Sequence, residues 1–297
     1  MKKILNSFGI GISAILLLTG CSTGPGQPQV YQIDKSIANS KEKVTIRLNF
    51  PKNDPITNKP LKINKNKLYS QITRKMYNLI NYYSFRRISK YDYRGVDITR
   101  EKNFYKIDYK NGYYYGTEFF LTEVIFKIPY QNLSNSIVLK YPTNYTIISC
   151  KDPLGFEIKL LDNPKSLQRD VYNILNKLSK TKLYIQEHYT LHGEINTKYP
   201  ADSIYANFKR LMGQYIGNYY WIDSKERISS IEKENTFNLK IKNKTYPINI
   251  KVYPYRNGSK VIYTAYISYK IYSDGTSTLT KQDIENAKKE IERVIND

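Results

Sequence analysis

Apolar residues recur at helical spacing in four stretches of the chain. Two of these stretches resemble each other, LYSQITRKMYNLINYY at 68–83 and IYANFKRLMGQYIGNYY at 204–220. Each carries apolar residues three and four positions apart, which is the stripe of an amphipathic helix. The stretches 163–180 and 280–297 carry the same kind of stripe. Thr280 stands where it would cap the last one, and Asp283 three residues on comes near the capping-box pattern. The pattern therefore predicts four helices.

Alternating apolar and polar residues predict strands around these helices. Strand-like segments at 43–50 and 183–199 precede the two similar helices. Longer alternating runs follow each helix, and each run contains an Asn-Gly pair, at 111–112 and 257–258. Asn-Gly is typical of a type I′ turn, because both residues accept positive φ angles. We expect an antiparallel hairpin at each pair.

The order of elements is the same in the two halves of the chain. The matched helix positions are Tyr69 with Tyr205, Ile72 with Phe208, Arg74 with Arg210, Met76 with Met212 and Ile80 with Ile216. This order predicts an α+β protein of two related β-α-β-β-β units, each a helix packed on an antiparallel sheet. The helix at 163–180 and the last helix then stand outside the repeat. The alternative is a chance likeness between two amphipathic helices.

The first residues of the chain read as an export signal. Two lysines precede an uncharged apolar run of about fifteen residues, Ile4 to Leu18, which is shorter than the roughly twenty of a membrane-spanning helix. Leu18-Thr19-Gly20-Cys21 resembles the lipobox of bacterial lipoproteins. The resemblance implies that Cys21 receives a diacylglyceryl group and, after cleavage, begins the mature protein. A plain secreted protein and an uncleaved inner-membrane anchor are the alternatives.

Residues 22–43 are rich in Gly, Pro, Ser, Gln and Asn and have no apolar period, which predicts a flexible tether. Ser22 suits an outer-membrane lipoprotein that faces the periplasm and carries acyl chains such as palmitate. In a Gram-positive host we expect the lipoprotein on the outer face of the cytoplasmic membrane instead. The predicted domains are a signal peptide at 1–20, the lipidated cysteine and tether at 21–42, a first α+β domain at 43–162, a linking helix at 163–181 and a second α+β domain with the C-terminal helix at 182–297.

The formal net charge of the chain is +21. For an exported protein this charge favours anionic lipids, envelope glycans or acidic protein partners, and we expect no nucleic acid. The alternative is codon bias, because Lys, Asn, Ile and Tyr are all encoded by AT-rich codons. That bias would also account for the 30 tyrosines.

Signatures of catalysis are missing from the sequence. It contains no Gly-rich nucleotide loop and no Gly-x-Ser-x-Gly elbow. The two histidines, His188 and His192, are expected on a strand; weak metal binding with Glu187 or Glu194 is the alternative. Cys150 is expected as a small buried hydrophobe, with a reactive thiol as the alternative. We expect no enzyme activity, no cofactor and no metal site.

The stretch YYSFRRISKYDYRG at 82–95 has the most binding character. It interleaves cations with aromatic rings, and its candidate binding residues are Arg86, Arg87, Lys90, Tyr91, Tyr93 and Arg94. Arginine forks can engage phosphate or carboxylate groups, and aromatic faces can stack on sugars. The alternative is a hairpin whose tyrosines form the core face and whose cations point to water.

In layout, a lipobox, a tether and two helix-on-sheet domains resemble lipoprotein subunits of the outer-membrane β-barrel assembly machinery. We therefore expect a non-enzymatic adaptor, scaffold or assembly subunit of an envelope protein complex, with strand addition at a sheet edge as one binding mode. The leading alternative is a lipoprotein that recognises an anionic lipid or glycan, such as lipopolysaccharide, peptidoglycan or phospholipid. A hydrolase with unidentified acids is the third.

Overall fold

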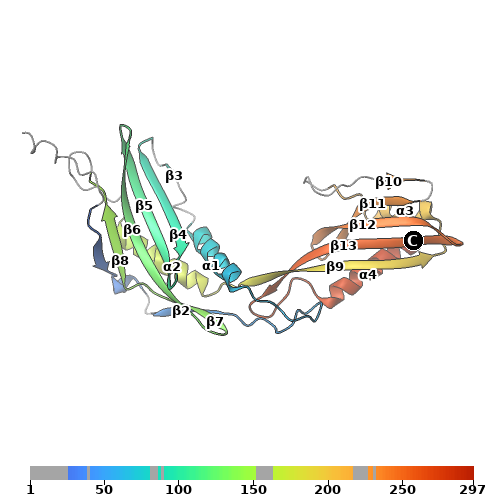
Figure 1. Ribbon diagram of the computed structural model, residues 1–297, viewed down its shortest axis with the longest axis horizontal. Coiled ribbons are helices and arrows are strands. Elements are labelled where there is room, and N and C mark those ends of the chain that lie inside the picture. Colours follow the sequence, from blue (N-terminus) through green and yellow to red (C-terminus); the bar gives the residue numbers. More distant parts are fainter. Residues whose placement is uncertain are drawn as a thin grey trace, which may run out of the picture. The chain divides into compact units, whose positions relative to one another are not determined.

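The structure is a computed structural model that describes residues 26–38, 41–80, 86–87, 90–151, 163–216, 227–229 and 232–297. For Arg86 and Arg87 it describes the backbone alone. The predicted signal peptide and Cys21 lie outside the described residues. The chain divides into two compact units, one formed by the residues before 49 together with 64–183, the other by 49–63 together with 184–297 (Figure 1).

Unit 1 is an antiparallel sheet of eight strands with two helices. Its strands are β1 (Gln29–Gln32), β2 (Lys43–Arg47), β3 (Arg86–Arg87), β4 (Asp92–Arg100), β5 (Phe104–Tyr115), β6 (Glu118–Asn132), β7 (Ser136–Lys140) and β8 (Asn144–Ser149). They lie in the order β1-β8-β6-β5-β4-β3, while β7 joins β2 to β6. Helices α1 (Lys65–Leu79) and α2 (Pro164–Leu178) contact each other, and each buries an apolar stripe.

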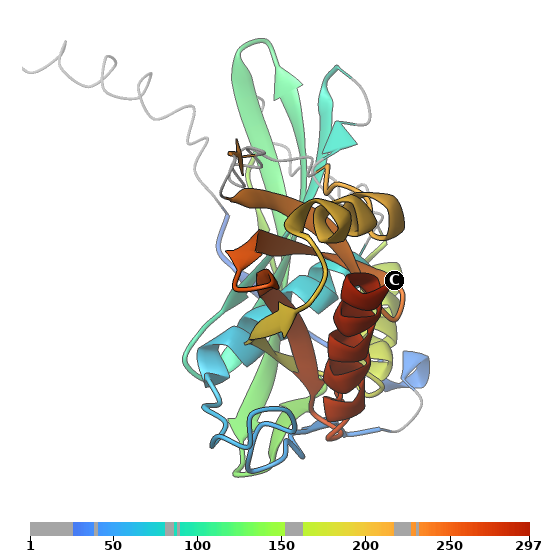
Figure 2. The same cartoon turned by 90° about the vertical axis from the view of Figure 1, so that its right-hand side faces the viewer.

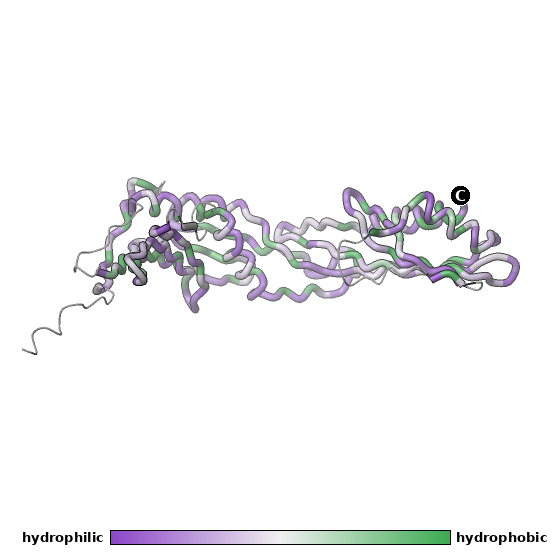
Figure 3. The backbone as a smooth tube through the Cα atoms, turned by 90° about the horizontal axis from the view of Figure 1, so that it is seen from above, coloured by the Kyte–Doolittle hydropathy of each residue, from purple (hydrophilic) through white to green (hydrophobic). Residues whose placement is uncertain are grey.

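Unit 2 is an antiparallel sheet of five strands with two helices. Its strands, β9 (Tyr184–Thr197), β10 (Arg227–Ile228), β11 (Lys233–Ile241), β12 (Lys244–Tyr255) and β13 (Gly258–Tyr272), lie in the order β10-β11-β12-β13-β9. Helices α3 (Ala201–Leu211) and α4 (Lys281–Asn296) lie next to each other (Figure 2). Buried and less buried residues alternate along β13, as expected for a sheet with one covered face. Figure 3 colours the chain by hydropathy and shows hydrophobic and hydrophilic stretches interspersed along the backbone.

The predicted α+β class is confirmed, and the two units share an order of elements. A strand precedes the first helix of each unit, several antiparallel strands follow, and a second helix ends the unit. The linking helix predicted at 163–181 is α2, which packs within unit 1 against α1 as α4 packs against α3 in unit 2. It therefore belongs to the repeated pattern, although we expected it to stand outside.

The helix repeat is shorter than the sequence match suggested. Ile72 and Phe208 are both fully buried at matched positions. The match of Ile80 with Ile216 fails, because Ile80 is buried and Ile216 is 88% exposed. Helix α3 ends at Leu211, and Gly213 follows it with φ 69°, a conformation typical just after a helix.

The two Asn-Gly predictions have different outcomes. The hairpin predicted at 257–258 is confirmed, because Tyr255 pairs with Gly258 across the β12–β13 turn. The positive φ of this turn lies at Arg256, at 53°, and not at the Asn-Gly pair as predicted. The hairpin predicted at 111–112 is wrong, because both residues lie inside β5 and the chain turns at 116–117. A Cβ on Gly112 would approach the Phe119 ring to 2.5 Å, so glycine is needed here for close packing.

Part of the predicted tether is folded onto unit 1. Strand β1 pairs with β8, Ile33 is buried, and the backbone N–H of Asp34 donates to the Gln168 side chain of α2 at 3.0 Å.

Residues 49–63, which the predicted boundaries placed in the first domain, lie in unit 2, where Ile56 joins the core. None of the helices in the described residues is long and apolar enough to cross a membrane.

Candidate binding surfaces

The predicted binding residues lie at one end of the unit 1 sheet. Backbone pairing of β3 with β4 sets Arg86 opposite Arg94 and Arg87 opposite Tyr93. The side chains of Arg86 and Arg87 are outside the described structure. Lys90 is exposed, and its Nζ lies 5.6 Å from the centre of the Tyr91 ring, which is 56% exposed. Lys90 and Tyr91 thus form an accessible cation and aromatic pair.

Tyr93 and Arg94 are less available than predicted, because both are half-buried. The Tyr93 ring meets the Phe119 ring edge to face, with ring centres 5.5 Å apart. Burial raises the pKa of the Tyr93 hydroxyl, and the nearby charge of Asp97 raises it further. Tyr93 therefore packs strand β4 against the β5–β6 hairpin. This packing role agrees with the alternative interpretation, in which the tyrosines form the core face of a hairpin.

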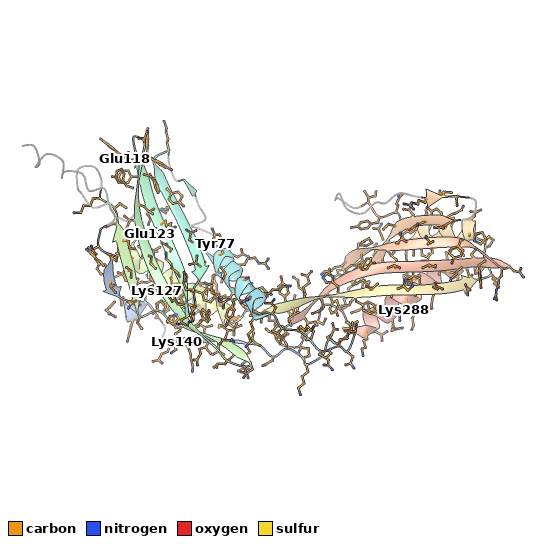
Figure 4. All side chains as sticks on the ribbon, viewed as in Figure 1. Tyr77, Glu118, Glu123, Lys127, Lys140 and Lys288 are labelled. Carbon is orange, nitrogen blue, oxygen red and sulfur yellow. The ribbon has the colours of Figure 1, made fainter. Side chains whose placement is uncertain are left out.

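Two further exposed rings of this end were not predicted from the sequence. Tyr115 is 65% exposed and Phe119 is 40% exposed, on the two sides of the β5–β6 turn. The stretch YYYGTEFF at 113–120 could have indicated them, because it places aromatic residues on both sides of a Gly-Thr turn. We call this group of exposed rings the aromatic end; it consists of Tyr91, Tyr115 and Phe119. Figure 4 labels Glu118 at this turn.

An ionic cluster lies in the middle of the same sheet. Lys110 Nζ is 2.5 Å from Asp97 Oδ2 and 4.0 Å from both Asp108 and Glu123, while Lys106 is 2.8 Å from Asp108. Burial and the negative charge of Asp108 raise the pKa of Glu123. Burial would lower the pKa of Lys110, but its hydrogen bond to Asp97 and the surrounding carboxylates raise it. The cluster pairs its acids with lysines, which is typical of a structural network.

The two histidines lie on the exposed face of β9. His192 Nδ1 is 3.0 Å from the hydroxyl of Thr264 on β13. Glu194 shares that face and is paired with Lys260 at 2.5 Å, whereas Glu187 lies on the other face by strand alternation. No three His, Cys, Asp or Glu side chains gather as metal ligands among the described residues. The geometry gives the metal alternative no support.

Cys150 differs from the expectation of a buried hydrophobe. It is half-buried just after β8, and its backbone N–H donates to the carbonyl of Leu121 at 2.9 Å. The neighbouring Lys151 is exposed. The end of β8 therefore adds a cation to the same end of unit 1 as Lys90.

A pocket of about 350 Å³ opens in unit 2 beside the start of α3. Its lining residues are Lys198, Pro200, Ala201, Asp202, Ser229, Glu232, Lys233, Val252, Pro254, Arg256, Asn257 and Gly258. The charges of this lining are mixed and partly paired, because Lys233 contacts Asp202 and Lys251 contacts Glu232 at 2.7 Å. Both acids of the lining, Asp202 and Glu232, are therefore held in ion pairs with lysines.

Strand β9 forms a long edge of the unit 2 sheet. All 14 of its residues pair with β13, and no strand in the described residues pairs with its other edge. On the face that the helices cover, Tyr189 and Ile195 are half-buried and pack at the margin of the core. An additional strand would cover them further.

Comparisons with known proteins add no functional assignment. No family model matches the chain, and no curated protein matches it. Among solved structures, the crystal structure of DynU16, a protein in the dynemicin biosynthetic locus, aligns over 86% of this chain and 97% of its own, with 7% identity and a TM-score of 0.18. A TM-score at this level carries no argument about fold or function.

Proposed function

We propose that the protein is an exported lipoprotein, anchored through Cys21, that serves as a non-enzymatic adaptor or scaffold in an envelope protein complex. The lipobox-like motif supports the anchor. The observation that carries the binding role is the edge of β9, with which no strand of the described ranges pairs. A partner would add an extended segment to β9 through main-chain hydrogen bonds, with side-chain pockets giving specificity.

The composition of β9 suits strand addition. Proteins usually protect an exposed edge with proline, a bulge, a short strand or a charge that points inward. Strand β9 has no proline, and its ladder with β13 runs in continuous register from Tyr184 to Thr197. Glu187 is the one charged residue on its helix-covered face, so residues 188–197 carry none of these protections.

A lipid anchor would make such an edge effective. Tethering to the membrane raises the concentration of the protein near any partner held in the same membrane. A modest edge interaction then suffices for assembly. The anchor and the edge thus act together in the proposed role.

Ile195→Lys tests the edge. This lysine would point to the helix-covered face, where it reaches water at a free edge but is trapped when a strand is added. Glu194→Lys is the matched control, because its side chain stays on the exposed face. The tagged full-length chain is purified in mild detergent from its native host, with both variants and Cys21→Ser beside it.

We expect a recurring protein partner that survives moderate salt, binds the Glu194→Lys variant, and is lost with Ile195→Lys and reduced with Cys21→Ser. An empty protein fraction enriched in anionic lipid or glycan would contradict the adaptor role. It would favour the alternative of a lipid- or glycan-binding lipoprotein, which the charge of +21 makes the second candidate. Binding of that kind weakens steeply as salt rises, because screening acts on exposed charges.

A further inference from the structure

The N-terminal part of the described chain joins unit 1 at the end of the sheet where the aromatic end lies. The backbone N–H of Gly26 donates to the carbonyl of Ser149 at 2.6 Å. Ser149 pairs with Thr122 on β6, Thr122 pairs with Asn111 on β5, and Asn111 pairs with Arg94 on β4. One row across the sheet therefore connects Gly26 to the base of the β5–β6 hairpin.

From this row, the chain back to Cys21 and the β5–β6 hairpin can extend over similar lengths. Five peptide steps separate Cys21 from Gly26 (26 − 21 = 5), so they span at most about 17 Å. Four residue steps along β5 lead from Asn111 to Tyr115, which carries the hairpin roughly 14 Å beyond the row. A lipid on Cys21 would hold the membrane surface within reach of the hairpin turn.

The side chains at this end suit a membrane surface. Tyrosine is enriched at membrane interfaces because its ring is apolar and its hydroxyl is polar, and Phe119 adds an apolar ring. Exposed Lys90 and Lys151 stand at the same end, against the exposed acid Glu118. Lysines near a membrane surface are attracted to anionic lipids.

We propose that the aromatic end is a second membrane contact, which lies in the headgroup region of the anionic phospholipid bilayer that holds the Cys21 lipid. This inference rests on the proposed lipidation of Cys21. Tyr91, Tyr115 and Phe119 enter the interface, while Lys90 and Lys151 face lipid phosphates. The two contacts together fix how unit 1 stands on the membrane, with the β5–β6 hairpin pointing into its surface.

Fluorescence quenching by brominated lipids tests the contact. The single tryptophan, Trp221, is replaced by Phe, and a reporter is placed at Tyr115→Trp. The matched control is Leu133→Trp, at a residue of unit 1 that is 41% exposed and follows the end of β6 opposite the β5–β6 turn. The acylated chain is purified from a lipoprotein-processing host and reconstituted in phosphatidylcholine and phosphatidylglycerol vesicles, after its intact mass has verified acylation.

We expect brominated lipid to quench the Tyr115→Trp reporter at least twofold more than the Leu133→Trp control. Lys90→Glu combined with Lys151→Glu is expected to reduce that difference. Equal quenching of the two reporters in an acylated protein would overturn the second contact and leave the anchor standing. An intact mass without acyl chains would overturn both the proposed function and this inference.

Discussion

The buried carboxylate of Asp54 accepts a hydrogen bond from the hydroxyl of Tyr269, 215 residues further along the chain. The same carboxylate accepts the backbone N–H groups of Ile56 at 2.7 Å and Thr57 at 3.1 Å. Burial raises the pKa of Tyr269, and the bond to Asp54 raises it further, so the hydroxyl stays a donor. This contact fastens residues 49–63 to unit 2.

Tyr269→Phe removes the hydroxyl that satisfies Asp54. The buried carboxylate then loses a partner, and a hydrogen bond to a charged group contributes about 1.5–3 kcal/mol. We expect the free energy of unfolding of unit 2 to fall by that amount, measured by urea denaturation with hydrogen exchange of β13 as the readout. Tyr266→Phe is the exposed control and should change it by less than about 0.5 kcal/mol. Equal stability of the two variants would contradict the account.

Gly193→Ala tests a close contact within the sheet. A Cβ at Gly193 would lie 2.2 Å from the hydroxyl oxygen of Tyr263 on β13, so the Tyr263 ring occupies the space that any side chain would need. Overpacking of this kind costs about 1–3 kcal/mol. In a Tyr263→Leu background the same alanine should cost much less, since the conflicting ring is gone. A cost that is unchanged in that background would exclude this explanation.

The start of α4 should show a dependence on pH. Thr280 and Asp283 form the reciprocal cap that the sequence suggested, and Lys242 Nζ lies 2.8 Å from Asp283. Burial alone would raise the pKa of Asp283, but the hydrogen bonds from Lys242 and Thr280 lower it below its ordinary value of 3.8. A lowered carboxylate pKa stabilises the fold above the unfolded pKa, and this stabilisation is lost as pH falls through the folded pKa.

Asp283→Ala is therefore expected to cost about 1 kcal/mol at pH 7, a typical value for a lost cap. The difference between wild type and variant should shrink as the pH falls below 3.8. Denaturation midpoints between pH 3 and pH 7 measure it. A difference that stays constant across this range would argue against the charge of Asp283 as the cause.

Glu123→Gln should behave in the opposite way. Burial and the charge of Asp108 raise the pKa of Glu123 above its ordinary value of 4.5, so the fold disfavours its ionised form. The cost is fully present above the folded pKa and absent below the unfolded one. We expect the variant to be more stable than wild type at pH 7 and to lose that advantage below pH 4.5. A destabilised variant at pH 7 would mean that the bonds to lysine dominate.

Much of the fold was predictable because its patterns are local. Four apolar stripes predicted four helices, and the cap of α4 by Thr280 and Asp283 was visible three residues apart. The place of residues 49–63 was not visible, because it depends on the contact of Asp54 with Tyr269 across most of the chain. The hairpin predicted at Asn111-Gly112 was wrong because the glycine is needed for close packing under Phe119, a tertiary contact that looks the same in the sequence as a turn.

The candidate surface was predicted in part. Of the predicted residues, Lys90 and Tyr91 are exposed, but exposure could not be read from residue type, so half-buried Tyr93 was chosen while Tyr115 was missed. The edge position of β9 follows from pairing with β13, between strands more than 60 residues apart, and no local pattern reveals it.

The intact mass of the protein purified from its native host tests the central claim most directly. We expect a chain that begins at Cys21 and carries the added mass of a diacylglyceryl group, with or without a further acyl chain. The Cys21→Ser variant should lack this mass and keep residues 1–20 or be released from the membrane. A wild-type chain with an unmodified Cys21 thiol would contradict the anchor and, with it, the proposed role.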